Sequence, residues 1–467
     1  MQPGYSSRVP MADLLSAAAY FALRKCGGPA IDVRAGRVDA QEAGTFGAPD
    51  PTETFHVHRM KFERANRTQS QMIQMIACGH CKFPYHTHLP LLTVHSIQAI
   101  GGVHGNDFPF ITSDSALDYT AHFDSTFNVY DNHVALDFIS ANTSNPLVAG
   151  PHQSNSDFRI FSSDGNKTIT SMSTPEGFAE TCKETITLMV DTVPEGVTLT
   201  DPITPSPLRP TNIQLTVSQD GSVNIQGEVR ADTTGVFNAQ LLDVELTFAD
   251  RNGKTLPNSI KAPYINRGFG LDFQFDYWKI DVNSPAGISS VFVKVGEKMF
   301  TNGGNGFEIS DKVVFQQQQS CYDASTKMLT VYGVVSMSIE NPDVELEVVD
   351  MRPRIGAIIP GLYKETVKMT KVTNGMKYTG YDLYKGTFTY TTTAGGEFSV
   401  AAYSGGKRYA DDFKMTSLFS GTCVSTFDLL FQPQNSHAFT RLPTKRLQPV
   451  FYGKKLILAC GHRLLNT

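Results

Sequence analysis

The sequence changes character at a proline-rich stretch, and this change limits the folds open to the chain. Residues 202–210 read Pro-Ile-Thr-Pro-Ser-Pro-Leu-Arg-Pro, which cannot continue a helix. Before this linker, apolar residues recur at helical spacing over residues 11–25, 68–80 and 178–193. The segments between them are rich in Gly, Asn, Asp and Ser and are expected to be long loops. The chain is therefore expected to hold two or three domains, the first mainly helical.

After the linker the pattern changes to the alternation that is typical of β-strands. Val, Ile, Thr and Phe alternate with polar residues, and turn pairs such as Asn252-Gly253 separate the runs. The run Asp243-Val244-Glu245-Leu246 returns as Asp343-Val344-Glu345-Leu346, about one immunoglobulin-like sandwich later. We therefore predict two tandem all-β sandwiches, over residues 205–312 and 313–423. A disulfide between Cys321 and Cys423, near the two ends of the second copy, is a further hypothesis.

Composition excludes some classes of function. The chain has 467 residues, with 40 basic against 45 acidic side chains, and so offers no basic surplus for a nucleic-acid backbone. No apolar run approaches the roughly 18 residues that a transmembrane helix needs. The first residues show no secretory signal pattern. Residues 424–467 are basic, and we expect this tail to be poorly ordered.

The densest group of chemically reactive side chains lies between residues 78 and 104. It consists of cysteines and histidines, namely Cys78, His80, Cys81, His86, His88, His95 and His104. One interpretation is a local zinc site, since Cys78, Cys81, His86 and His88 together supply four suitable ligands. The spacing matches no common zinc finger, however, and the residues on either side of the group favour a different interpretation.

Those flanking residues resemble the plant-type haem peroxidase superfamily, in particular its secreted fungal branch fused to β-sandwich modules. An apolar helix over residues 71–77 leads into Cys78-Gly79-His80, and Ile100-Gly101-Gly102-Val103-His104 follows later. In that family the first histidine of this motif is the axial ligand of haem iron, so the resemblance implies that role for His80. It also implies that residues 1–200 form a mainly helical haem peroxidase-like domain.

Three further segments match the family in the same order. The strip Arg34-Ala35-Gly36-Arg37-Val38-Asp39 resembles the one that follows the family's Gly-Gly-Pro motif. Residues 124–132 resemble the proximal calcium loop, which implies an oxygen-only calcium site. Its ligands would be Asp124, Thr126, Val129 and Asp131. Residues 159–164 resemble the segment with a buried aspartate, which implies that Asp164 accepts a hydrogen bond from His80.

The resemblance implies a secreted, haem b-dependent and calcium-binding peroxidase that reduces hydrogen peroxide and oxidises small reducing substrates. The family carries its distal catalytic pair in the motif Arg-x-x-Phe-His. Here Phe55-His56 has no arginine three residues before the phenylalanine, so the domain is expected to lack its N-terminal distal part and this chain to be impaired.

An insert and an alternative function complete the sequence-based interpretation. Residues 81–99 split the family's Gly-His-Ser-Ile-Gly-Gly motif, and we interpret them as a translated intron.

The alternative function is a non-catalytic secreted or surface protein that acts through its β-sandwiches, whose ligands the sequence does not reveal. Asn66, Asn142 and Asn166 stand in sequons that permit N-glycosylation, at about the number expected by chance.

Overall fold

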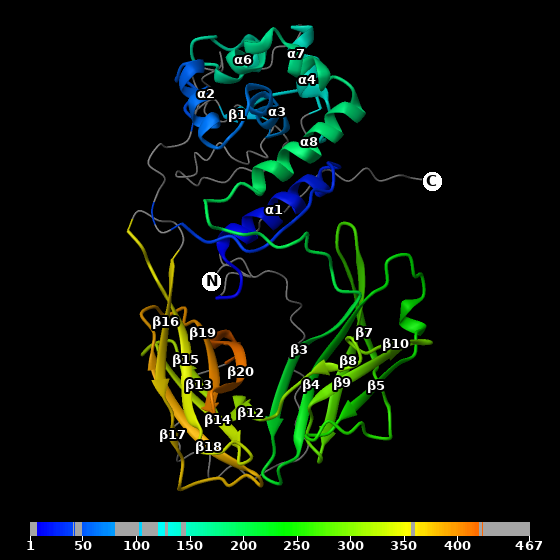
Figure 1. Cartoon of the computed structure of the whole chain (residues 1–467), viewed down its shortest axis with the longest axis vertical. Coiled ribbons are helices and arrows are strands. Elements are labelled where there is room, and N and C mark those ends of the chain that lie inside the picture. Colours follow the sequence, from blue (N-terminus) through cyan, green and yellow to red (C-terminus); the bar gives the residue numbers. More distant parts are fainter. Residues whose placement is uncertain are drawn as a thin grey trace. The chain divides into compact units, whose positions relative to one another are not determined.

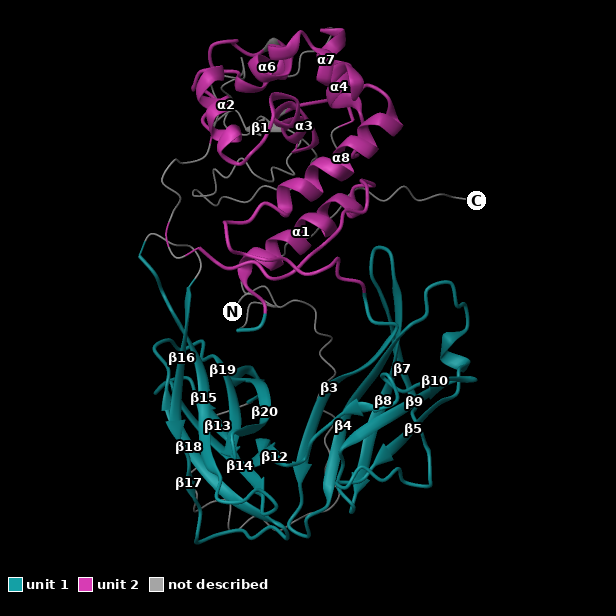
Figure 2. Cartoon of the chain, viewed as in Figure 1, with its two compact units in different colours: residues 1–2, 6–8, 205–445 teal, residues 3–5, 9–204, 446–467 magenta. Residues whose placement is uncertain are grey.

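The structure is a computed structural model of the chain (Figure 1). It describes residues 7–40, 42, 49–79, 102–104, 120–126, 129–141, 146–355, 360–419 and 423. The chain divides into two compact units near residue 205 (Figure 2). We call Val9–Thr204 the helical unit, and Pro205 onwards, together with the short segment at Ser7 and Arg8, the β unit. His80, the insert 81–99 and the tail 424–467 lie outside the described residues.

The helical unit is built around α3, whose buried face contacts α8, α7, α6 and α2. Its helices are α1 (Met11–Lys25), α2 (Phe55–Arg64), α3 (Gln69–Gly79), α4 (His133–Ser140), α5 (Pro146–Ala149), α6 (Ser156–Phe161), α7 (Lys167–Ser171) and α8 (Pro175–Val190). Strands β1 (Gly102–His104) and β2 (Thr120–His122) form an antiparallel pair. A 3₁₀ turn, η1 (Ser162–Asp164), joins α6 to the segment before α7. None of the helices in these described ranges combines the length and apolar content needed to cross a bilayer.

The predicted helix over residues 11–25 is confirmed, and two other predictions are corrected. The third predicted helix begins three residues earlier, at Pro175, because the Thr174 hydroxyl accepts a hydrogen bond from Gly177 N and caps it. The loop prediction between the helices was wrong for α2, α4, α5, α6 and α7. Helix α2 fully buries only His58, while Phe55 and Phe62 pack against the core and stay partly exposed, so its apolar stripe is weak.

A buried arginine connects the first and last helices of this unit. The Arg37 guanidinium is almost fully buried and lies 3.0 Å from carboxylate oxygens of both Asp13 in α1 and Asp191 at the end of α8. Its Nε also donates to the carbonyl of Val190 at 2.9 Å. Because a buried charge is costly unless it is paired and hydrogen-bonded, this arrangement fixes both helices against the same side chain.

The residues on either side of Arg37 make that geometry possible. Gly36 has φ +108°, and a Cβ there would lie 2.8 Å from the Thr198 carbonyl oxygen, so only glycine fits. Asp39 accepts hydrogen bonds from the backbone N–H groups of Met11 and Ala12, at 3.0 and 2.8 Å, and so caps α1 from a distance in sequence. The strip that the family resemblance singled out thus has a structural role in this chain.

The β unit contains four sheets, so the prediction of an all-β C-terminal part is confirmed. The strands of the first pair of sheets are β3 (Leu208–Val217), β4 (Val223–Asp232), β5 (Val244–Ala249), β6 (Ile260–Lys261), β7 (Tyr264–Phe269), β8 (Gln274–Ser284), β9 (Ser290–Val295), β10 (Lys298–Phe300) and β11 (Phe307–Glu308). Those of the second pair are β12 (Val313–Phe315), β13 (Cys321–Asp323), β14 (Met328–Ser336), β15 (Asp343–Arg352), β16 (Gly361–Lys368), β17 (Thr370–Lys371), β18 (Tyr381–Thr389), β19 (Glu397–Ser404) and β20 (Lys407–Met415).

The two pairs of sheets share one strand order. The first has β3-β4-β8-β7 facing β10-β9-β5-β6, and the second has β12-β14-β18-β17 facing β20-β19-β15-β16. In both, the order is that of the immunoglobulin-like sandwich. The repeated sequence run marks the same strand in each copy, β5 and β15, where Val244 and Val344 are buried. Matching ion pairs, Lys261 with Asp243 and Lys368 with Asp343, flank these strands.

A disulfide and a shared core hold the second sandwich in place. Cys321 on β13 is bonded to Cys423, which confirms the predicted bridge. The core of the first sandwich also includes buried residues of the second, namely Val314, Val334, Tyr378, Tyr381 and Leu383. Arg251 joins the two: its Nε lies 2.7 Å from Asp311 Oδ2 and its Nη2 donates to Tyr381 Oη at 2.9 Å.

Replacing Arg37 with methionine should lower the free energy of unfolding of the helical unit by about 3–5 kcal/mol, because Asp13 would be left buried without its cation. The control is Arg59→Met, which removes an exposed pair with Glu63 on α2 and should cost under about 1 kcal/mol. Urea unfolding followed by the helical circular dichroism signal measures both. Equal losses for the two variants would contradict the role assigned to Arg37.

Candidate functional site

The end of α3 is anchored covalently. Cys78, in its last turn, forms a disulfide with Cys182 in α8, and both residues are fully buried. The Tyr130 hydroxyl donates to the Cys78 carbonyl oxygen at 3.2 Å. The bridge excludes the zinc site considered from the sequence, since a disulfide sulfur is not a thiolate ligand. Sequence reasoning missed this pair, whose cysteines are 104 residues apart.

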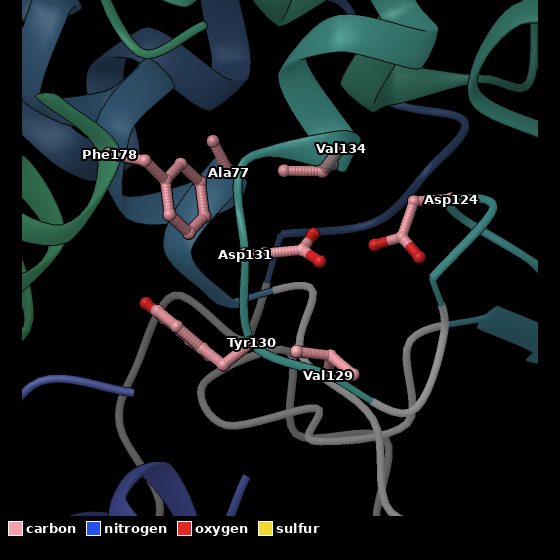
Figure 3. A pocket seen from close by; sticks show the side chains of 7 residues that line it. All are labelled: Ala77, Asp124, Val129, Tyr130, Asp131, Val134 and Phe178. Carbon is pink, nitrogen blue, oxygen red and sulfur yellow. The ribbon is translucent and has the colours of Figure 1, made fainter. Parts of the chain in front are cut away.

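A small pocket lies beside that last turn (Figure 3). Its lining comes from α3, α4, α8 and the loop before α4, and consists of Ala77, Asp124, Val129, Tyr130, Asp131, Val134 and Phe178. Figure 3 shows the carboxylates of Asp124 and Asp131 turned towards the same space, with apolar side chains around the Asp131 carboxylate. The pocket therefore places two acidic groups against the helix end that directly precedes His80.

Hydrogen bonds within the loop hold these acidic groups. The Thr126 hydroxyl donates to Asp131 Oδ1 at 2.8 Å, and the Thr126 N–H donates to Asp124 Oδ1 at 3.0 Å. Asp131 Oδ1 also accepts from His133 N at 3.0 Å. The structure thus brings together Asp124, Thr126 and Asp131, three of the four calcium ligands implied by the resemblance. Val129, the fourth, also lines the pocket.

The donor set suits a hard cation. Carboxylate, hydroxyl and backbone carbonyl oxygens are the ligands that calcium takes in proteins. Within the described ranges no group of three or more His, Cys, Asp or Glu side chains is placed to hold a metal ion. A cation in this pocket would therefore depend on two carboxylates, completed by neutral oxygens from Thr126, the loop backbone and water.

Asp164 lies at the other end of α3. Its Oδ2 accepts hydrogen bonds from the Thr168 hydroxyl and N–H, and that hydroxyl is 3.0 Å from the hydroxyl of Ser70 in the first turn of α3. Asp164 Oδ1 is buried and has no hydrogen-bond partner among the described residues. His80 lies outside the described residues, so its pairing with Asp164 stays a prediction.

A buried histidine that sequence reasoning did not single out lies on α2. His58 is 1% exposed, and its Nε2 is 2.8 Å from the Asp50 carbonyl oxygen, so Nε2 carries the proton and donates. Its Nδ1 is buried and has no hydrogen-bond partner within the described part of the chain. Desolvation by burial, with a contribution from Arg159, lowers the pKa of His58, against the opposing effects of Asp50, Glu53 and Asp157.

Comparisons with known proteins agree with part of the sequence-based interpretation. A family model described as peroxidase matches residues 2–88, which include α1, the Arg37 strip, α2, α3 and His80. A WSC domain-containing protein of Arthroderma benhamiae is 31% identical over 431 residues, covering 90% of this chain and 55% of the relative. The chain thus spans about half the length of that relative, and the similarity extends over both units.

The free energy of unfolding of the helical unit should fall as the pH drops from 7 to 5. A lowered pKa means that the folded state favours neutral His58, so its contribution is complete above the unfolded pKa of about 6.5 and is lost as the pH falls through it. The slope is at most about 1.4 kcal/mol per pH unit. His58→Gln, which keeps a donor for Asp50, should flatten the profile, whereas His56→Gln at an exposed position should not. Parallel wild-type and His58→Gln profiles in urea unfolding would contradict this.

Proposed function

We propose that the helical unit is a peroxidase-related, haem-binding domain with His80 as the axial ligand of iron. The observation that carries the proposal is the place of the acidic pocket, against the last turn of the helix that leads into His80. The peroxidase match over residues 2–88 includes the same helix. The substrates would be hydrogen peroxide and small reducing compounds. Secretion is part of the proposal and rests on the two disulfides, which are typical of oxidising compartments.

The residues around α3 would position the ligand. Haem b, when bound, supplies the redox-active iron. The Cys78–Cys182 bridge and the Tyr130 hydroxyl hold the backbone of Cys78, two residues before His80 in the sequence. The hydrogen bond from His80 to Asp164 stays a prediction of the family resemblance.

Peroxide chemistry also needs a proton carrier and a cation on the distal side. A distal histidine moves a proton between the peroxide oxygens, and an arginine stabilises the charge that develops on the leaving oxygen. The printed sequence contains no Arg-x-x-Phe-His motif. We therefore propose that this chain binds haem but turns over peroxide slowly.

Haemin reconstitution tests the ligand. Wild-type protein mixed with haemin should show a shifted, saturable Soret band, and His80→Ala should lose it, because the variant lacks the imidazole that binds the iron. The matched control is His56→Ala, which removes an exposed histidine of α2 and should leave the band unchanged. Identical spectra for wild type and His80→Ala would refute the assignment.

The second candidate function is non-catalytic binding through the sandwiches. The observation that favours it is the similarity to a protein named only for a WSC domain, which extends across the β unit. Peroxide-dependent dye oxidation separates the candidates. Turnover above free haemin that is lost in His80→Ala supports the enzyme. A rate equal to free haemin, together with no Soret shift, supports the binding protein.

We also propose that the acidic pocket binds calcium through Asp124, Thr126, Val129 and Asp131. At calcium about 100-fold above its Kd, the helical unit should gain about 2.7 kcal/mol of stability. Asp131→Asn should abolish this gain, because it removes one of the two pocket carboxylates. Asp137→Asn should retain it, since Asp137 accepts from Ser125 N in the same loop but does not line the pocket. Thermal unfolding with calcium or a chelator measures the effect, and an equal gain in Asp131→Asn would refute the site.

A further inference from the structure

Two asparagines in the helical unit share an unusual backbone conformation. Asn66, between α2 and α3, has φ 56°, and Asn166, just before α7, has φ 65°. Both are left-handed residues in tight turns, which asparagine tolerates better than most residues. Both side chains are exposed, and neither hydrogen-bonds to another described residue. Their amide nitrogens therefore point to solvent with no structural task in the fold.

The two turns are neighbours at one end of α3. Gln69 Nε2 donates to Ser163 Oγ at 3.0 Å, and the hydroxyls of Ser70 and Thr168 are 3.0 Å apart. These bonds connect the first turn of α3, directly after Asn66, with the segment around Asn166. The acidic pocket lies at the opposite end of the same helix, beside Ala77.

Each asparagine opens a three-residue acceptor sequence. The sequences are Asn66-Arg67-Thr68 and Asn166-Lys167-Thr168, and residues 167–467 contain no other. The modification takes place in the same compartment in which disulfides form, and the structure contains two of these, Cys78–Cys182 and Cys321–Cys423. The sequence and the compartment therefore agree for both sites, and both asparagine side chains are exposed.

We propose that Asn66 and Asn166 carry N-linked glycans, an inference that rests on the secretion included in the proposed function. The donor would be an oligosaccharide attached to a lipid pyrophosphate. The Asn side-chain nitrogen loses a proton and forms a bond to C1 of the first sugar, while the bond from C1 to the pyrophosphate oxygen breaks and the lipid pyrophosphate leaves. No oxidant or reductant is needed.

The structure also indicates whether each asparagine is glycosylated before or after the domain folds. Thr168 is 6% exposed, and its hydroxyl donates to Asp164 at 2.6 Å, so the acceptor sequence of Asn166 is not accessible in the folded domain. Transfer to Asn166 therefore precedes folding. Thr68 is exposed, so Asn66 can be modified before or after folding. Both glycans would cover the first-turn end of α3 and leave the pocket end uncovered.

Secretion of the full chain, behind an added leader, from a eukaryotic host tests the proposal. The Asn142→Gln background removes the sequon that lies outside the described residues, so that any glycan comes from the two proposed sites. Enzymatic removal of N-glycans should lower the apparent mass, and removal in ¹⁸O-labelled water should convert residues 66 and 166 to labelled aspartate in peptide mass spectra. Asn66→Gln and Asn166→Gln should each remove one glycan.

Two substitutions at Thr68 separate the acceptor sequence from the helix cap. Thr68 caps α3 by accepting from Gln71 N, and both Ser and Asp keep a capping oxygen. Thr68→Ser should retain a glycan on Asn66, whereas Thr68→Asp should lose it while the helical circular dichroism stays unchanged. Unmodified Asn66 or Asn166 peptides from the secreted Asn142→Gln protein would overturn the proposal for that site, whatever the outcome of the haem experiments.

Discussion

The Cys78–Cys182 disulfide is the constraint on which the candidate site depends. It joins the last turn of α3 to α8 across 104 residues of sequence, a loop length for which a crosslink is worth about 4–5 kcal/mol in the chain-entropy model. The pocket is lined from both helices, by Ala77 of α3 and Phe178 of α8. The bridge therefore determines where the two helices that line the pocket can lie, before any metal or cofactor is considered.

The parts of the fold that could be predicted are those with a strong local pattern. The alternation of β5 and β15 is visible in the sequence because each strand buries one regular face. The apolar spacing of α1 predicted a helix but not its buried face, which includes Asp13 and Ser16 while Leu15 is exposed. Helix α2 was missed because its only fully buried residue is the polar His58, and Phe55 and Phe62 are partly exposed. The Arg37 cluster was visible only as part of a resemblance, since its partners Asp13 and Asp191 are far apart in the chain.

The candidate site follows the same rule. Asp124, Thr126 and Asp131 could be predicted together because they belong to one short loop whose hydrogen bonds are local. The bond between Cys78 and Cys182 could not, because only the packing of α3 on α8 brings these residues together.

Because the two sandwiches of the β unit share a core, they are not two independent domains. By sequence and strand order the β unit contains two copies of one fold. The side chains of Val314, Val334 and Leu383, however, complete the interior of the first copy, and Arg251 bonds to Asp311 and Tyr381. Cutting the chain between the copies would expose an apolar face on each side of the cut. In thermodynamic terms the two repeats form one cooperative body, which we expect to unfold in a single transition.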